Sequence, residues 1–194
     1  MFLNIITPCS RPENLLKISE SINIPRENYR WIVVCDSDYL PDNSLIPENC
    51  EIYNHKNLNS SYGNSQRNYA IDMVKKGHIY FNDDDTLMHP NLWENIKDFN
   101  FDFLSFNQLL KNGNPRLTGN ITITLNNANV LIKGLVSIGD IDCHNFIVSN
   151  DIVKDTRFIV GRYDADGHFA TECYKKSIII LYINKALSIY NSLR

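Results

Sequence analysis

Short apolar runs alternate with amphipathic stretches along the first half of the chain. Four apolar runs have the length of buried strands and lie at residues 2–7, 31–35, 51–54 and 79–81. Three stretches with apolar residues at helical spacing begin near residues 10, 64 and 90. Strands that alternate with helices through short connections predict a parallel sheet with helices on its faces.

Residues that favour helix ends support two of these helices. Ser10 and Glu13 have the spacing of a capping box, which predicts that the first helix starts there. Asn64 or Ser65 is suited to cap the second helix, and Gly77 is suited to its C-terminal end.

The pattern changes in the second half, where strands separated by turns outnumber helices. Predicted strands lie at residues 101–106, 121–125, 130–132, 146–148 and 177–183. One helix is predicted from about residue 164 to residue 174. Residues 1–194 therefore predict a single α/β domain, with a mainly parallel central sheet flanked by helices and a smaller antiparallel part in the C-terminal half.

The composition narrows the class of partner. The net charge of −3 argues against a nucleic-acid-binding protein, which usually carries a basic face. It leaves room for a phosphate-containing substrate, because a bound metal ion can supply local positive charge. Five cysteines without a C-x-x-C pair argue against a disulfide framework or a structural zinc site. With no signal peptide and no apolar run of about 20 residues, we expect a cytoplasmic chain without a transmembrane segment.

Polar residues gather where the predicted strands of the first half end. Thr7 ends the first strand, Asp36-Ser37-Asp38 follows the second, and Asp83-Asp84-Asp85 follows the fourth. Because ligands of parallel α/β sheets bind outside the carboxyl ends of the strands, these clusters are expected to converge.

The acidic triplet at residues 83–85 is the most informative of these clusters. In an exposed loop, the repulsion between two of these carboxylates costs only about 1 kcal/mol. One interpretation of the triplet is therefore a solvated acidic loop. The other is a divalent cation site, because carboxylates with open positions suit Mg²⁺ or Mn²⁺ bound to a diphosphate. The D-x-D-x-D-G spacing of a calcium-binding EF-hand is absent.

An ordered set of motifs extends over most of the chain. It comprises Ile5-Ile6-Thr7-Pro8 with Arg11-Pro12, Val33-Val34-Cys35-Asp36, Gly63-Asn64-Ser65-Gln66-Arg67-Asn68, and Tyr80-Phe81-Asn82-Asp83-Asp84-Asp85 with Pro90. In this order and spacing the chain resembles the GT-A glycosyltransferases, in particular the family 2-like group. The resemblance implies a GT-A fold. It implies the transfer of a sugar from a nucleotide-diphospho-sugar, with a UDP-sugar as the expected donor, to a glycan or another acceptor that has a hydroxyl group. It also implies Mn²⁺ or Mg²⁺, a nucleotide-sugar-binding half at residues 1–100 and an acceptor-binding half at residues 101–194.

The resemblance also assigns residues to the donor side. The expected nucleotide-binding residues are Thr7, Pro8, Arg11, Asp36, Asp38, Arg67, Asp83 and Asp84. Asp83 and Asp85 would form the D-x-D motif, with Asp85 as the principal metal contact and Asp83 near the ribose or the metal. Asn82 stands where the family usually has leucine, at a position that only ends the strand.

Inverting members of this group use a carboxylate as general base, placed at the start of a late helix. Asp166 is our first candidate and Asp164 the second, although Ala165 stands where an acidic partner is common. The competing interpretation is that both aspartates stabilise the N-terminus of the helix. Four further residues are candidates for the acceptor pocket, namely Asp142, His144, Arg116 and His168; either histidine could also complete a metal shell.

Two other functions stay open. A sugar-nucleotide-forming nucleotidyltransferase shares the sheet pattern and the need for a metal, but it normally has a glycine-rich stretch after the first strand. Residues 8–12 contain no glycine at that place. A non-catalytic carbohydrate- or nucleotide-binding module on a transferase-like scaffold is the third interpretation. Direct displacement with inversion is the expected course, and the stereochemistry is not fixed by the sequence.

Overall fold

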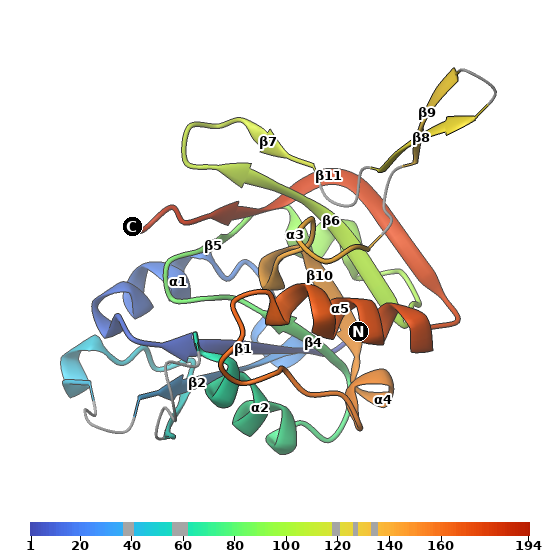
Figure 1. Cartoon of the computed structure of the whole chain (residues 1–194). Coiled ribbons are helices and arrows are strands. Elements are labelled where there is room, and N and C mark those ends of the chain that lie inside the picture. Colours follow the sequence, from blue (N-terminus) through green and yellow to red (C-terminus); the bar gives the residue numbers. More distant parts are fainter. Residues whose placement is uncertain (37–40, 56–61, 118–120, 126–127, 133–135) are drawn as a thin grey trace.

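The computed structural model describes the whole chain except residues 37–40, 56–61, 118–120, 126–127 and 133–135, which Figure 1 draws as a thin grey trace. The described strands form a nine-stranded sheet of order β3-β2-β1-β4-β10-β6-β11-β5, with β7 paired to β6, and a separate β8-β9 pair. The fold is mixed α/β, as the sequence predicts.

The first half supplies the parallel part of the sheet. Its four strands are β1 (Leu3–Cys9), β2 (Tyr29–Cys35), β3 (Glu51–Asn54) and β4 (His78–Phe81). β1 is parallel to both β2 and β4, and β2 is parallel to β3. All seven residues of β1 are buried, because helices cover both faces of the sheet. Burial on both faces explains why the strand is a continuous apolar run in the sequence.

The second half adds the antiparallel part. Its strands are β6 (Phe103–Leu110), β7 (Pro115–Arg116), β8 (Ile121–Leu125), β9 (Ala128–Ile132), β10 (Phe146–Ser149) and β11 (Ile180–Tyr190). A short strand of the first half, β5 (Leu87–Met88), pairs antiparallel with β11. β10 is antiparallel to both of its neighbours, β4 and β6, and so joins the two halves into one sheet. β11 runs parallel to β6, and the β8-β9 hairpin projects from the body of the molecule (Figure 1).

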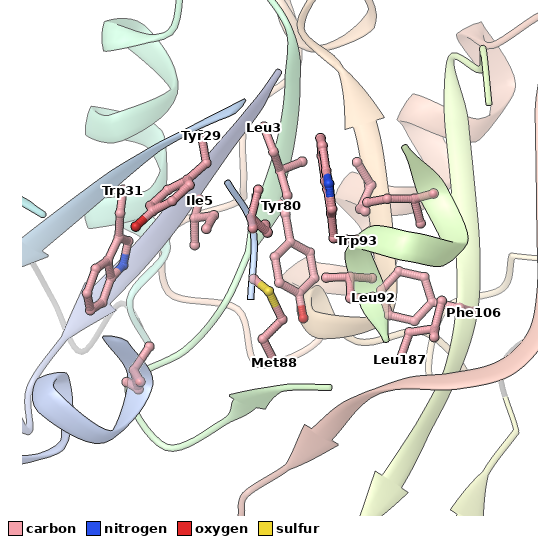
Figure 2. Packing of buried hydrophobic residues seen from close by; sticks show 14 of the residues in the cluster. Leu3, Ile5, Tyr29, Trp31, Tyr80, Met88, Leu92, Trp93, Phe106 and Leu187 are labelled. Atoms are coloured by element: carbon pink, nitrogen blue, oxygen red, sulfur yellow. The ribbon is translucent and has the colours of Figure 1, made fainter. Parts of the chain in front are cut away.

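Helices divide the core into two apolar clusters, one on each face of the sheet. The helices are α1 (Leu15–Ser21), α2 (Asn64–Met73), α3 (Leu92–Ile96), α4 (Asn150–Val153) and α5 (Ala165–Lys176), with single 3₁₀ turns at Pro12–Asn14, Arg26–Asn28, Asn43–Leu45 and Cys143–Asn145. Ile5 belongs to the cluster under α1 and α3, and Ile6 belongs to the cluster under α2 and α5. This alternation follows from the two-residue period of a strand. Figure 2 shows the first cluster, whose aromatic members include Trp31, Tyr80 and Trp93.

Three local predictions need correction. The capping box is wrong, because Ser10 lies in a loop, a 3₁₀ turn precedes α1, and neither helix start has a side-chain cap. The residue before α2 is Gly63, so neither Asn64 nor Ser65 is its cap. β11 extends to Tyr190, well beyond the predicted end at residue 183.

The five cysteines are free thiols. Among the described residues, none of the helices is long and apolar enough to cross a membrane.

Candidate functional site

One hydroxyl group links β1 to β2 and to the residue that follows β4. Thr7 Oγ1 donates a hydrogen bond to the carbonyl oxygen of Asn82 (2.7 Å) and accepts one from Nε1 of Trp31 (2.9 Å). Thr7 is fully buried. Its hydroxyl therefore helps to hold these strands in place, and the contact of Thr7 with a nucleotide stays a prediction.

A first cleft of about 270 Å³ opens beyond these strand ends. Its lining residues come from the loops after β1, β2 and β4, the start of α2 and the final residue of the chain: Pro8, Cys9, Ser10, Arg11, Asp36, Tyr62, Gly63, Gln66, Arg67, Asp83, Asp84 and Arg194. Six predicted donor residues are among them, namely Pro8, Arg11, Asp36, Arg67, Asp83 and Asp84. Asp38, also predicted, lies outside the described residues. The polar clusters at the strand ends thus converge, as expected from the parallel topology.

Gly63 closes one wall of this cleft and cannot easily be replaced. It has φ +81°, in the left-handed region, and a Cβ there would lie 2.9 Å from Cβ of Pro8. The glycine lets the start of α2 approach the loop after β1.

Asp84, the middle carboxylate of the triplet, is a structural anchor. It is buried and accepts hydrogen bonds from the backbone N–H groups of Ser10 (2.5 Å) and Arg11 (2.8 Å) and from Nε of Arg11 (2.9 Å). It also forms an ion pair with Nη2 of Arg11. Because these donors engage both of its oxygens, Asp84 fastens the loop after β1 to the loop after β4.

Asp83 faces the opposite direction, toward the second half of the chain. One of its oxygens lies 2.5 Å from Nη2 of Arg67, and the other lies 3.0 Å from Nε2 of His144. Burial raises the pKa of Asp83, but the charges of Arg67 and His144 outweigh burial and hold the pKa well below its usual range. Asp83 is therefore a carboxylate at every physiological pH.

Asp85 is held by two arginines. Its Oδ2 lies 2.9 Å from Nη2 of Arg11 and 2.5 Å from Nε of Arg194, while Oδ1 accepts a hydrogen bond from Oγ1 of Thr86 (3.3 Å). The side chain of Asp85 is 2% exposed, whereas that of Arg194 is 60% exposed. The guanidinium group of Arg194 thus covers a buried carboxylate from the solvent side.

The contacts of Asp83, Asp84 and Asp85 indicate which of these carboxylates could bind a metal ion. Within the part of the chain that the structure describes, no three His, Cys, Asp or Glu side chains are grouped to hold an ion. Mg²⁺ and similar ions, however, are often bound by one or two carboxylates together with substrate phosphates and water. Asp85 can supply one such carboxylate. Its Oδ2 is bound by both Arg11 and Arg194, and the Arg194 side chain is the more exposed of the two.

A second cleft of about 320 Å³ adjoins the first. It shares four residues with the first cleft, namely Tyr62, Arg67, Asp83 and Arg194. The other lining residues are Asn64 and a set from the second half: Arg116, Gly139, Ile141, Asp142, His144, Tyr163, Asp164, Asp166, Gly167, Tyr190 and Asn191. Asp142, His144, Arg116, Asp164 and Asp166, all predicted for the acceptor side, come together here.

A row of alternating charges crosses the floor of the second cleft. His144 Nδ1 lies 2.7 Å from Asp142, and Nη1 of Arg116 lies 3.0 Å from the other oxygen of Asp142. The Arg116 guanidinium also sits over the ring of Tyr190, 5.1 Å from its centroid. Burial lowers the pKa of His144, but the charges of Asp83 and Asp142 raise it well above its usual value. His144 is thus cationic at neutral pH and bridges two carboxylates, which is unlike a metal ligand.

The two candidates for the general base occupy different environments. Asp164 is at the N-cap position of α5 without a side-chain cap bond, and Arg162 holds it by two hydrogen bonds of 2.8 and 2.7 Å. Arg162 lowers the pKa of Asp164 to about 2. Asp166 is the second residue of α5, where burial and the nearby Asp142 raise its pKa, against the effect of Arg67. Of the two, Asp166 has the environment that general bases require.

His168 does not join this group. Its side chain is partly buried, and its Nε2 lies 3.3 Å from Asp164, one helical turn earlier. Two residues that the sequence analysis missed, Arg194 and Tyr62, line both clefts. Neither belongs to a recognisable motif, so only their position in space identifies them.

Replacing His144 by glutamine is expected to reduce the free energy of unfolding by about 3 kcal/mol, because Asp83 and Asp142 lose a shared buried cation. The pKa of His144 is higher in the folded state, so its stabilisation is complete below about pH 6.5 and is lost as the pH rises through the raised pKa. Urea unfolding of both proteins at a series of pH values from slightly acidic to alkaline measures this difference.

The matched control is His168→Gln, which removes a partly exposed pair and is expected to change stability by less than about 0.5 kcal/mol at any of these pH values. A stability difference for His144→Gln that does not shrink at alkaline pH would mean that His144 is neutral in the folded protein.

The curled sheet and its flanking helices form the GT-A fold of glycosyltransferases, and solved structures with this fold match nearly the whole chain. The crystal structure of residues 1–349 of S. aureus TarS is one of them. The match covers 97% of this chain and 60% of the TarS fragment, with 17% identity and a TM-score of 0.72. The same fragment in complex with UDP matches with 18% identity and a TM-score of 0.74. The chain therefore spans about three fifths of these fragments.

A third match comes from another organism. The mannosyltransferase PcManGT from Pyrobaculum calidifontis, in complex with GDP-Man and Mn²⁺, matches 97% of this chain and 56% of its own length, with 10% identity and a TM-score of 0.66. No protein-family model matches the sequence, and no curated protein matches it. At these identities the likeness establishes the fold.

Proposed function

We propose that the protein transfers a sugar from a nucleotide-diphospho-sugar to a hydroxyl group of an acceptor. A UDP-sugar is the donor that we propose. The observation that carries this proposal is the pair of adjoining clefts, which share Tyr62, Arg67, Asp83 and Arg194. A transferase must bring two substrates together at one point. The complexes of TarS with UDP-GlcNAc and with UDP, and of PcManGT with GDP-Man, support a nucleotide-sugar donor.

The donor would occupy the first cleft and the acceptor the second. Apart from Arg194, the lining of the first cleft comes from residues 1–100, which supports a nucleotide-sugar-binding half. Asp36 would bind the nucleoside, and Arg11 and Arg67 would face the diphosphate. Most of the second cleft comes from residues 101–194, which supports an acceptor-binding half.

We propose Mn²⁺ or Mg²⁺ as the cofactor, held by Asp85 with Asp83 nearby, after the Arg194 side chain leaves Asp85. When bound, the ion would stabilise the negative charge of the departing diphosphate. The Mn²⁺ in the PcManGT complex supports this proposal. The residues of this chain orient the donor: Asp84 fixes the loop that presents Arg11, and the cationic His144 keeps Asp83 ionised and in place.

Asp166 is the proposed general base. It would accept the proton of the acceptor hydroxyl, and the resulting oxygen nucleophile would attack the anomeric carbon and displace the nucleoside diphosphate with inversion. Its raised pKa makes it a stronger base than an ordinary carboxylate, and its position in the second cleft places it on the acceptor side.

A thermal-shift panel of UDP, GDP, ADP and UDP-sugars tests the donor assignment. UDP with Mn²⁺ is expected to stabilise the protein by about 2.7 kcal/mol at a hundredfold excess over its dissociation constant. UDP with EDTA should give a much smaller shift, because the diphosphate then lacks its counter-ion. No response to any nucleotide would refute the proposal.

The same protein preparation separates the remaining functions. Metal-dependent hydrolysis of a UDP-sugar in the absence of acceptor would support a transferase. Pyrophosphate release from a sugar 1-phosphate and a nucleoside triphosphate would instead identify a nucleotidyltransferase. Binding without turnover across donors and acceptors would identify a non-catalytic module.

A further inference from the structure

Two tyrosine rings lie exposed at the mouth of the second cleft. The side chain of Tyr163 is 86% exposed and that of Tyr62 is 61% exposed, although large aromatic rings are usually buried. The two rings contact each other edge to face, with centroids 5.9 Å apart and planes at 85°. They come from loops far apart in the sequence, so the pair is a product of the tertiary structure.

A buried polar network holds the backbones of both tyrosines. Nη1 of Arg67 donates to the carbonyl oxygen of Tyr62 and to Oδ1 of Asn64, both at 3.0 Å. Nδ2 of Asn64 in turn donates to the carbonyl oxygens of Ile159 (3.3 Å) and Arg162 (3.1 Å), in the loop that carries Tyr163. Arg67 and Asn64 are both almost fully buried. The pair is therefore positioned before any ligand arrives.

The backbone at Tyr62 is strained. Its φ is +52°, in the left-handed region that side chains other than those of glycine, asparagine and aspartate rarely adopt. Such strain persists only where surrounding contacts enforce it, and it is common at ligand-binding positions. Here the enforcing contact is the hydrogen bond from Arg67 to the Tyr62 carbonyl group.

The surroundings of the pair indicate the class of ligand. Asp142, Asp164 and Asp166 line the same cleft and offer acceptors for hydroxyl groups. The C–H groups on one face of a pyranose ring are attracted to the negative face of an aromatic ring, while its hydroxyl groups point outward to polar partners. The cationic side chains of Arg116 and His144 line the same cleft and offer donors, so an aromatic pair beside these mixed polar groups suits the ring and the hydroxyl groups of a sugar.

We propose that Tyr62 and Tyr163 form a platform for a pyranose ring of the acceptor, so that the acceptor is a carbohydrate. This proposal rests on the proposed function, because it assigns the second cleft to the acceptor. Tyr163 lines the second cleft only, whereas Asp36, the predicted nucleoside contact, lines the first cleft only. The platform is therefore placed on the acceptor side, with Tyr62 at the boundary between the two substrates.

Saturation-transfer NMR with methyl pyranosides of glucose, galactose, mannose and N-acetylglucosamine tests the platform on the full chain, and UDP with Mg²⁺ serves as the donor-site probe. We expect saturation to be transferred from the protein to the ring C–H protons of at least one glycoside. Tyr163→Ala is expected to reduce the affinity for that glycoside about tenfold, which corresponds to the loss of a good aromatic contact. The affinity for UDP should stay unchanged. Tyr163→Phe keeps the ring and should bind as the original protein does.

Phe99→Ala is the matched control, because Phe99 is also a half-exposed aromatic residue but lines neither of the two clefts. If no glycoside binds while UDP does, or if Tyr163→Ala weakens UDP and spares the glycosides, the platform does not bind an acceptor sugar. A third outcome is that UDP does not bind, while a glycoside binds and its binding requires Tyr163. The proposal of a UDP-sugar donor would then be wrong, and the platform would still be a sugar-binding site.

Discussion

Replacing Asp85 by asparagine is expected to reduce sugar transfer by about 10²–10³-fold, the range observed when one group that stabilises transition-state charge is lost. Asp85 is the buried carboxylate that would hold the metal ion. It shares Arg11 with Asp84, but of the two only Asp85 also pairs with Arg194 in the described structure. The Mn²⁺-dependent part of the UDP thermal shift should disappear in the same variant. Both measurements are made with a UDP-sugar that the original protein hydrolyses.

Arg194→Ala provides the opposite test at the same atom. Removal of the guanidinium group that lies 2.5 Å from Asp85 should increase the affinity of the nucleotide-free protein for Mn²⁺, measured by electron paramagnetic resonance of the free ion. Asp98→Asn, at an exposed position, is the control for a general loss of charge. If Asp85→Asn keeps the Mn²⁺ response and the activity, the triplet serves only to anchor arginines.

Replacing Asp166 by asparagine is expected to reduce transfer by about 10²–10⁴-fold, the usual contribution of a general base, while UDP binding stays intact. In the original protein kcat/KM should rise with pH as Asp166 loses its proton. Because burial raises its pKa, this rise should occur at a pH above the ordinary range of aspartate. The pH–rate profile of Asp166→Asn should lack this acidic limb.

Asp164→Asn is the matched control for this prediction. It changes the neighbouring carboxylate at the same helix start, where Asp164 is exposed and paired with Arg162. Its activity should stay within about threefold of the original, since exposed ion pairs contribute little. A large loss in Asp164→Asn with normal activity in Asp166→Asn would transfer the role of the base to Asp164.

Much of the fold could be predicted because β1, β2 and β4 are almost wholly buried and are therefore continuous apolar runs. β3 and β8 have the predicted bounds, and the other predicted strands of the first half differ by one or two residues at their ends. β11 is the instructive exception. Its pairing with β6 is interrupted by register shifts between Ile183 and Ala186 and between Ala186 and Ser188. The polar residues Asn184 and Lys185 lie at this irregularity and end the apolar run, although the strand continues.

The start of the first helix shows the limit of local patterns. Ser10 and Glu13 have capping-box spacing, yet the Ser10 hydroxyl group donates to Asp84, 74 residues away. A local spacing rule compares only neighbouring residues. It cannot detect a buried carboxylate from another strand end that competes for the same donor.

The sequence by itself determined the order of the longer strands and helices, but not the short elements β5, β7 and α4. It also determined the gathering of aspartates at the carboxyl ends of the strands, because both follow from hydrophobic periodicity and parallel topology. Only the tertiary structure decided the role open to each aspartate: Asp84 between the backbone N–H groups of Ser10 and Arg11, Asp83 between Arg67 and His144, and Asp85 under Arg194. The physical reason is that ionisation and ligand binding depend on the charges within a few ångströms of a carboxylate, and these come from distant parts of the chain.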